Sequence, residues 1–181
     1  MAASSPDPGC LSHHECGRPQ EGNTVLHAAV LARQRTLLRF MLSSVIGNHL
    51  ELTAQNARGL TPIEVAKELG ETEAVSWLED ARISLCQQLV DAAGGGDSAR
   101  VHSLVRRGAV VTWGDKHGVT ALHQAAFTGH ADLAVELLSL GADASAVTKD
   151  GVSPLDLALR VDEREVVEAI RVRGMCSMAV V

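Results

Sequence analysis

The residues of this chain best suited to coordinate a metal lie close to its N-terminus. Cys10, His13, His14 and Cys16 place four soft ligands within a seven-residue stretch. A structural zinc site usually needs four ligands in tetrahedral geometry, supplied by two paired motifs. The sequence has no second cluster of this kind, so we expect the stretch to belong to a solvated tail and predict no metal site.

Motifs that would indicate an enzyme are missing from the sequence. It has no phosphate loop ending in Lys and Ser or Thr, no H-E-x-x-H, no G-x-S-x-G and no C-x-x-C. A run of glycines at 94–96 lacks the preceding strand of a nucleotide-binding motif, and we expect it to form a turn between helices. The chain is therefore predicted to be no enzyme and to need no cofactor.

Composition limits the partners and the compartment. The 181 residues include 16 Lys and Arg against 22 Asp and Glu, a formal charge of −6, which disfavours nucleic acid as a partner. No apolar run approaches the length of a membrane span, and the start lacks the regions of a signal peptide. The four cysteines show no paired spacing, which favours a reducing compartment. We expect a monomer in the cytoplasm, the nucleus or both.

Two segments of the sequence are similar to each other at a fixed offset. Residues 87–109 align without a gap on residues 120–142, an offset of 33. The alignment superimposes the Ala pair 92–93 on 125–126 and the Gly-Ala pair 108–109 on 141–142. Repetition at such a period predicts a stacked array of helical units.

The period breaks in the middle of the chain. From Thr61 to Gln87 is 26 residues, seven short of a full period. We predict a helix at about 72–79 and an early start to the next, at about 83–93. Two arrangements remain open: two stacked sub-arrays, 22–80 and 83–174, or a single stack with one shortened loop. The predicted divisions are a disordered tail at 1–20, repeats 1 and 2 at 21–80, repeats 3 to 5 at 81–174 and a short tail at 175–181, with Gly174 ending the last helix.

Four openings carry a common phrase, at residues 24–29, 61–66, 120–125 and 153–158 (TVLHAA, TPIEVA, TALHQA and SPLDLA). Thr or Ser caps a helix through its hydroxyl, and Pro suits the first helical position. The phrase resembles the T-P-L-H-x-A signature of ankyrin repeats, whose period agrees. The resemblance implies an all-α ankyrin-repeat solenoid of about five helix-turn-helix units with an irregular join near residues 80–86. It also implies that His27 and His123 bond the backbone of a neighbouring repeat.

The resemblance further implies an adaptor that binds a protein partner through its concave face and loop tips. An inhibitory or regulatory subunit that occupies a groove of an enzyme or transcription factor is the alternative. Phe127 and Trp113 are the expected anchors, because covering an aromatic side chain contributes strongly to binding. The predicted partner-binding residues are Arg58, Leu60, Glu68, Trp113, Lys116, His117, Val119, Phe127, Thr128, Lys149 and Arg160.

Overall fold

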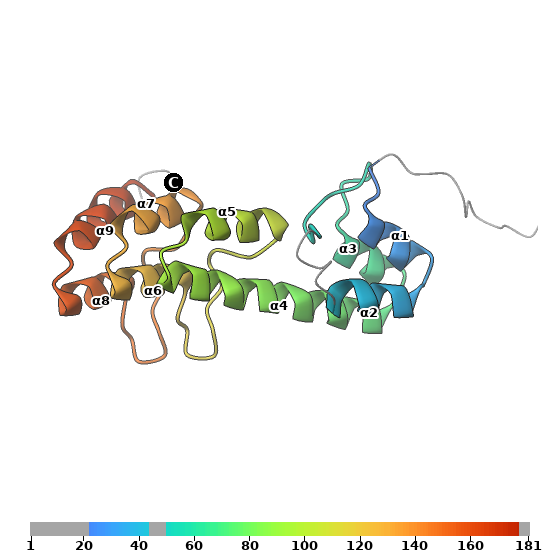
Figure 1. Ribbon diagram of the computed structural model, residues 1–181, viewed down its shortest axis with the longest axis horizontal. Coiled ribbons are helices and arrows are strands. Elements are labelled where there is room, and N and C mark those ends of the chain that lie inside the picture. Colours follow the sequence, from blue (N-terminus) through green and yellow to red (C-terminus); the bar gives the residue numbers. More distant parts are fainter. Residues whose placement is uncertain (1–21, 44–49, 178–181) are drawn as a thin grey trace, which may run out of the picture.

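The computed structural model describes residues 22–43 and 50–177, and within these ranges the chain is helical (Figure 1). The helices there are α1 (Val25–Leu31), α2 (Arg35–Ser43), α3 (Pro62–Glu68), α4 (Thr72–Gly94), α5 (Ser98–Arg107), α6 (Ala121–Thr128), α7 (Ala131–Ser139), α8 (Pro154–Val161) and α9 (Arg164–Ser177). An isolated bridge between Gly114 and Thr120 is the β-type pairing in this part. The prediction of an all-α repeat solenoid is confirmed. The predicted N-terminal tail with its Cys and His cluster lies outside the described residues.

The common phrase forms the same helix start four times. The side chain of Thr24, Thr61, Thr120 or Ser153 accepts a hydrogen bond from the backbone N–H three residues later. The side chain of that later residue accepts a bond from the cap's own N–H, which completes a capping box. His, Glu and Asp can all act as this acceptor, which explains why the fourth position of the phrase varies.

The break in the period produces one long helix. Helix α4 runs for 23 residues without interruption, so the prediction of two helices at about 72–79 and 83–93 was wrong. Neither a shortened loop nor a new helix start occurs there. The seven-residue deletion removes the turn and loop, and the remaining residues 80–86 contain no Gly or Pro to end the helix. The first half of α4 is the second helix of repeat 2, and its last half is the first helix of repeat 3.

Because one helix serves both repeats, the two groups of repeats face opposite ways. In Figure 1, α4 continues the row of α6 and α8, whereas α1 and α3 lie in the upper row with α5, α7 and α9. The loop before α3 is therefore on the upper side, and the loops before α6 and α8 extend below. The upper loop contacts repeat 3, where the Leu52 N–H donates to the Arg107 carbonyl at 3.0 Å.

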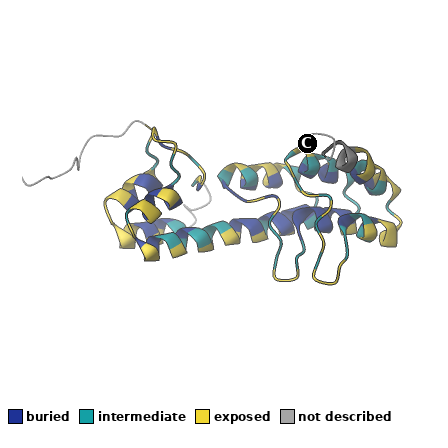
Figure 2. Cartoon of the chain, turned by 180° about the vertical axis from the view of Figure 1, so that it is seen from behind, coloured by how far each residue is buried: buried dark blue, intermediate teal, exposed yellow. Residues whose placement is uncertain are grey.

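The core is built from small and branched aliphatic residues along the line where the two rows meet (Figure 2). Ala66, Ala93, Ala126 and Ala158 are completely buried. Side chains this small allow neighbouring helices to approach closely, which is how thin repeats fill their interior without aromatic residues. In the described part of the chain, no helix is both long and apolar enough to cross a bilayer.

The last helix is longer than predicted. Helix α9 continues to Ser177, so Gly174 does not end it and the first residues of the predicted tail are helical. A glycine inside a helix costs only about 1 kcal/mol, which the surrounding helix tolerates.

Candidate protein-binding surface

The loop before α6 is held in shape by Asp115. Its Oδ1 accepts hydrogen bonds from the backbone N–H groups of His117 and Val119, at 2.8 and 2.9 Å. Partial burial raises the pKa of this carboxyl, but the bonds from Val119 and His117 and the charges of His117 and Lys116 outweigh it. The pKa of Asp115 therefore lies below its ordinary value, and the ionised side chain fixes the tip that carries Lys116 and His117.

The other two loops use the same device. Asn56 Oδ1 accepts from the N–H groups of Arg58 and Leu60, at 2.9 and 3.1 Å, and Thr148 Oγ1 accepts from the Val152 N–H at 3.2 Å. The tips of repeats 4 and 5 are also joined, because the Lys149 N–H donates to the His117 carbonyl at 2.8 Å. These bonds order the tips before any partner arrives, which lowers the entropic cost of binding.

A buried histidine ties each of two repeats to the next loop. His123 Nδ1 accepts from the Thr120 N–H at 3.2 Å, so Nε2 carries the proton and donates to the Val152 carbonyl at 3.1 Å. Burial lowers the pKa of His123 despite this bond, which keeps the ring neutral at neutral pH. His27 Nε2 bonds the Leu60 carbonyl at 2.8 Å in the same way. The predicted backbone-bonding role of both histidines is confirmed.

Six of the predicted residues belong to repeats 4 and 5 and are exposed. Lys116, His117 and Lys149 are exposed at the tips, and Phe127, Thr128 and Arg160 are exposed at the ends of α6 and α8. Phe127 keeps 54% of its surface exposed. These six residues are called the repeat 4–5 surface below.

A family comparison agrees with the repeat structure. Residues 89–175 match the family model for ankyrin repeats in three copies. The chain is an ankyrin-repeat protein. Ankyrin repeats are units that mediate protein–protein interaction.

Two curated proteins are similar to this ankyrin array over different parts of its length. Protein phosphatase 1 regulatory subunit 27 of Homo sapiens is 40% identical over 83 residues, which are 46% of this chain and 53% of the relative. B-cell lymphoma 3 protein homolog of Mus musculus is 28% identical over 160 residues, 84% of this chain and 35% of that protein. The chain thus spans about half the length of the phosphatase regulatory subunit and a smaller part of the lymphoma protein.

The predicted residues of repeats 1 and 2 lie apart from the repeat 4–5 surface of the ankyrin array. Arg58 and Glu68 belong to the group whose loop points to the upper side (Figure 1), and they pair with each other at 3.0 Å. Leu60 is half-buried, and its carbonyl is the acceptor for His27. The sequence alone did not reveal this separation, because the reversal depends on α4 being continuous.

The two predicted anchors differ in their surroundings. Trp113 is partly buried and packs against the core, whereas Phe127 projects from the array. Val119, another predicted residue, is half-buried. Leu159 was not singled out from the sequence, yet it is 52% exposed. The period aligns it with buried Ala126, so its exposure follows from its place in the last repeat that the structure describes. No group of three or more His, Cys, Asp or Glu among the described residues is placed to hold a metal ion.

Proposed function

We propose that this ankyrin array is an adaptor that binds a protein partner through the repeat 4–5 surface. The observation that carries the proposal is the exposure of Phe127 at the end of α6. The equivalent positions in the other repeats hold Leu31, Glu68, Gly94 and Arg160. An aromatic side chain gains most from being covered by a partner, and it loses little conformational freedom when it is. In this proposal the protein acts as a monomer in the cytoplasm, the nucleus or both.

The charges of the repeat 4–5 surface suggest the chemistry of the partner. Lys116, Lys149 and Arg160 give this surface three exposed cations on a chain whose formal charge is −6. Two carboxylates of these repeats are engaged by their own backbone, Asp115 by its loop and Asp156 by the Ser153 cap at 3.0 Å, while Asp150 is exposed beside Lys149. A partner segment with acidic residues flanking an apolar side chain is complementary to this surface, since opposite charges speed association and fix the register.

A regulatory subunit is the alternative, and the name of one group of relatives favours it. The human and mouse relatives are both named protein phosphatase 1 regulatory subunit 27. An adaptor joins several partners, whereas a regulatory subunit changes the activity of one enzyme. Adding the purified protein to a protein phosphatase 1 catalytic subunit separates the two: altered turnover supports the regulatory role, and unaltered turnover supports the adaptor.

The surface itself is tested with Phe127→Ala and a matched control, Ile83→Ala. Ile83 is 49% exposed on α4, outside the repeat 4–5 surface, so both changes truncate an exposed apolar side chain. Affinity purification of the wild type, followed by mass spectrometry, identifies the partners. We expect Phe127→Ala to lose them, by about tenfold or more in affinity, without a change in melting temperature. Ile83→Ala should keep them.

The result that contradicts the proposal is a lowered melting temperature in Phe127→Ala with its partners retained. Phe127 would then stabilise the fold and bind nothing. A double charge reversal, Lys116→Glu with Lys149→Glu, provides an independent check, because exposed tip residues contribute little to stability. Retention of every partner by this double variant would also contradict the proposed surface.

A further inference from the structure

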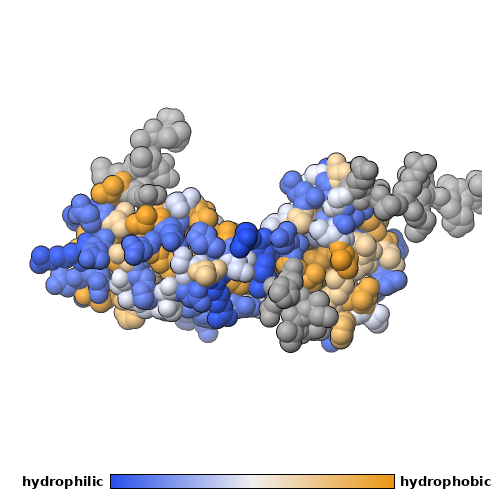
Figure 3. Space-filling model, turned by 45° about the horizontal axis from the view of Figure 1, so that its top comes forward, coloured by the Kyte–Doolittle hydropathy of each residue, from blue (hydrophilic) through white to orange (hydrophobic). Residues whose placement is uncertain are grey.

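A groove runs between α7 and α9 on the side of the molecule opposite the tips of repeats 4 and 5. Its volume is about 610 Å³. Figure 3 looks toward the upper row of helices, where hydrophilic residues cover most of repeats 3 to 5 with smaller hydrophobic patches between them. The groove is lined by Ala131, Asp132, Val135, Arg164, Glu165, Glu168, Ala169 and Val172.

The preceding pair of second helices, α5 and α7, is bridged by polar side chains, and the repeat period explains why α7 and α9 are not. Between α5 and α7, Ser98 donates a hydrogen bond to Glu136, and His102 Nε2 lies 3.2 Å from the same carboxylate. Moving these three positions forward by 33 residues leads to Ala131, Val135 and Ala169. These side chains are too short and apolar to form a polar bridge. One pair is therefore joined by a polar bridge, while the groove between α7 and α9 keeps aliphatic side chains at the same positions.

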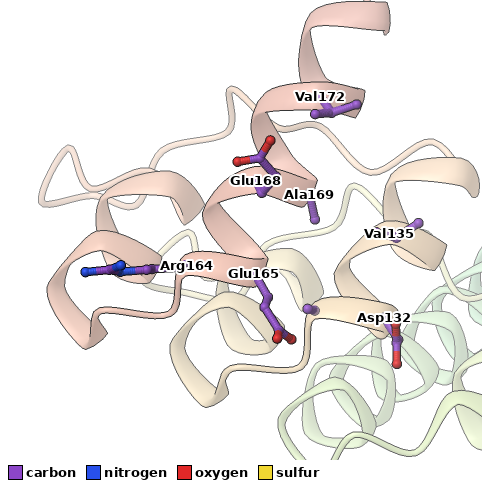
Figure 4. Close-up of a pocket in the computed structure, with 8 residues that line it drawn as sticks. Asp132, Val135, Arg164, Glu165, Glu168, Ala169 and Val172 are labelled. Carbon is purple, nitrogen blue, oxygen red and sulfur yellow. The ribbon is translucent and has the colours of Figure 1, made fainter.

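The close-up of the groove shows how its charges are placed (Figure 4). Val135 and Ala169 lie on facing sides, and Val172 lies farther along α9. Asp132 and Glu165 both project at the end of the groove where the two helices begin, whereas Arg164 points away from it. Val172 keeps 63% of its surface exposed. The groove thus combines an apolar floor with negative charge at one end, and the single cation of its lining is turned outward.

We propose that this groove binds a basic amphipathic helix of a partner protein. Aliphatic side chains on one face of that helix would cover Val135, Ala169 and Val172, as in other complexes where a helix lies in a groove. Lys or Arg residues at its end would meet Asp132 and Glu165, because charge complementarity favours a cationic segment over an acidic one. This site is separate from the repeat 4–5 surface, whose cations suit an acidic segment, so a single protein could join partners of opposite charge.

The experiment measures binding of a labelled Leu/Lys amphipathic helical peptide to the full chain by fluorescence anisotropy. A peptide of the same composition without an apolar face, and a Leu/Glu amphipathic peptide, are the comparison probes. The decisive variant combines Val135→His with Ala169→Glu, which transplants two of the three polar residues of the α5–α7 bridge, His102 and Glu136, into the groove. We expect the wild type to bind the Leu/Lys peptide and the transplant to lose binding by about tenfold or more.

Charge is tested separately with Glu165→Lys and a matched control, Glu51→Lys. Both residues are exposed, and both changes alter the net charge equally, but Glu51 lies outside the groove. Glu165→Lys should weaken binding severalfold, while Glu51→Lys should not, and added salt should weaken the wild-type complex. Melting temperatures confirm that each variant folds.

Several results would overturn the proposal. One is that the wild type does not bind the Leu/Lys peptide, or binds it no better than the Leu/Glu peptide and the peptide without an apolar face. Equal binding by the transplant variant, or equal weakening by Glu51→Lys and Glu165→Lys, would do the same. We expect the transplant variant to lose the Leu/Lys peptide but to retain the partners that depend on Phe127, because the two surfaces are independent.

Discussion

Repeats 1 and 2 differ from repeats 3 to 5 in the way that neighbouring repeats are held together. Repeat 1 reaches repeat 2 through charge: Arg33 Nε lies 3.3 Å and Arg35 Nη2 2.9 Å from the carboxylate of Glu71, whose side chain is only 7% exposed. Repeats 3 to 5 pack through small buried residues such as Ala93 and Ala126, and a polar bridge from Ser98 and His102 to Glu136 also joins repeats 3 and 4. Helix α4 belongs to both groups and turns the second group over. The seven-residue deletion therefore reverses the facing of the two groups.

The turns between paired helices also differ from repeat to repeat. Gly96 and Gly129 adopt positive φ, and the side chains of His130 and Glu163 from the next repeat lie directly against them. In repeats 1 and 5 this position is occupied by Arg33 and Asp162, with φ of 51° and 59°. A non-glycine residue is uncommon in this conformation. At the first joint, the ion pair of Arg33 with Glu71 takes the place of the close glycine contact.

The largest expected effect comes from interrupting α4 where the two groups meet. Ser84→Pro removes a backbone donor from the middle of the helix and should lower the free energy of unfolding by about 3 kcal/mol or more. Ser84 is exposed, so no buried side chain is lost. Thermal and urea denaturation give the change, and the control Ser84→Ala should be close to neutral.

Limited proteolysis adds a local readout to this prediction. In Ser84→Pro we expect new cleavage near residue 84, because the opened helix exposes its backbone. If Ser84→Pro unfolded with the same midpoint as Ser84→Ala and resisted cleavage, α4 would not hold the two groups together.

The sequence predicted the repeats well and their arrangement poorly, for a physical reason. Capping positions such as Thr120 and Ser153 act locally, so the phrase predicted where helices begin. Whether a helix ends at Glu79 depends on the absence of a breaker and on burial of Leu78 and Leu85 along one continuous stripe. The continuity of α4 determines how repeats 1 and 2 face relative to repeats 3 to 5. It therefore also determines which predicted residues belong to the same side of the molecule. The α7–α9 groove was equally hidden, although the period relates Ala169 to Glu136.

A second prediction compares the two kinds of joint at one repeat position. Glu71 and Glu163 are both ten residues after a capping residue, Thr61 and Ser153. Glu71→Ala leaves two arginines without their buried partner and should lower the free energy of unfolding by about 2 kcal/mol. Glu163→Ala removes no ion pair that the structure contains and should stay within about 0.5 kcal/mol.

Urea denaturation of both variants at neutral pH and at moderate and high salt gives this comparison. The effect of Glu71→Ala should persist at high salt, since a buried carboxylate is screened less than an exposed one. Equal effects of the two substitutions would mean that the charged joint contributes nothing particular to repeat 1.

The smallest expected effect concerns the capping box, which holds His123 in repeat 4 and Asp156 in repeat 5. Burial lowers the pKa of His123 below its ordinary value of 6.5, so the unfolded chain takes up this proton first as the pH falls. Stability from His123 is therefore complete above about pH 6.5 and decreases below it. The bonds from the Ser153 backbone and hydroxyl lower the pKa of Asp156 below 3.8, so its contribution persists until the pH falls through that lowered value.

His123→Gln keeps an acceptor in the box but cannot titrate, and its stability should fall less than that of the wild type between about pH 7 and pH 5. Asp156→Asn should leave this window unchanged, and the same slope for His123→Gln and the wild type would show that His123 is not held neutral by its burial.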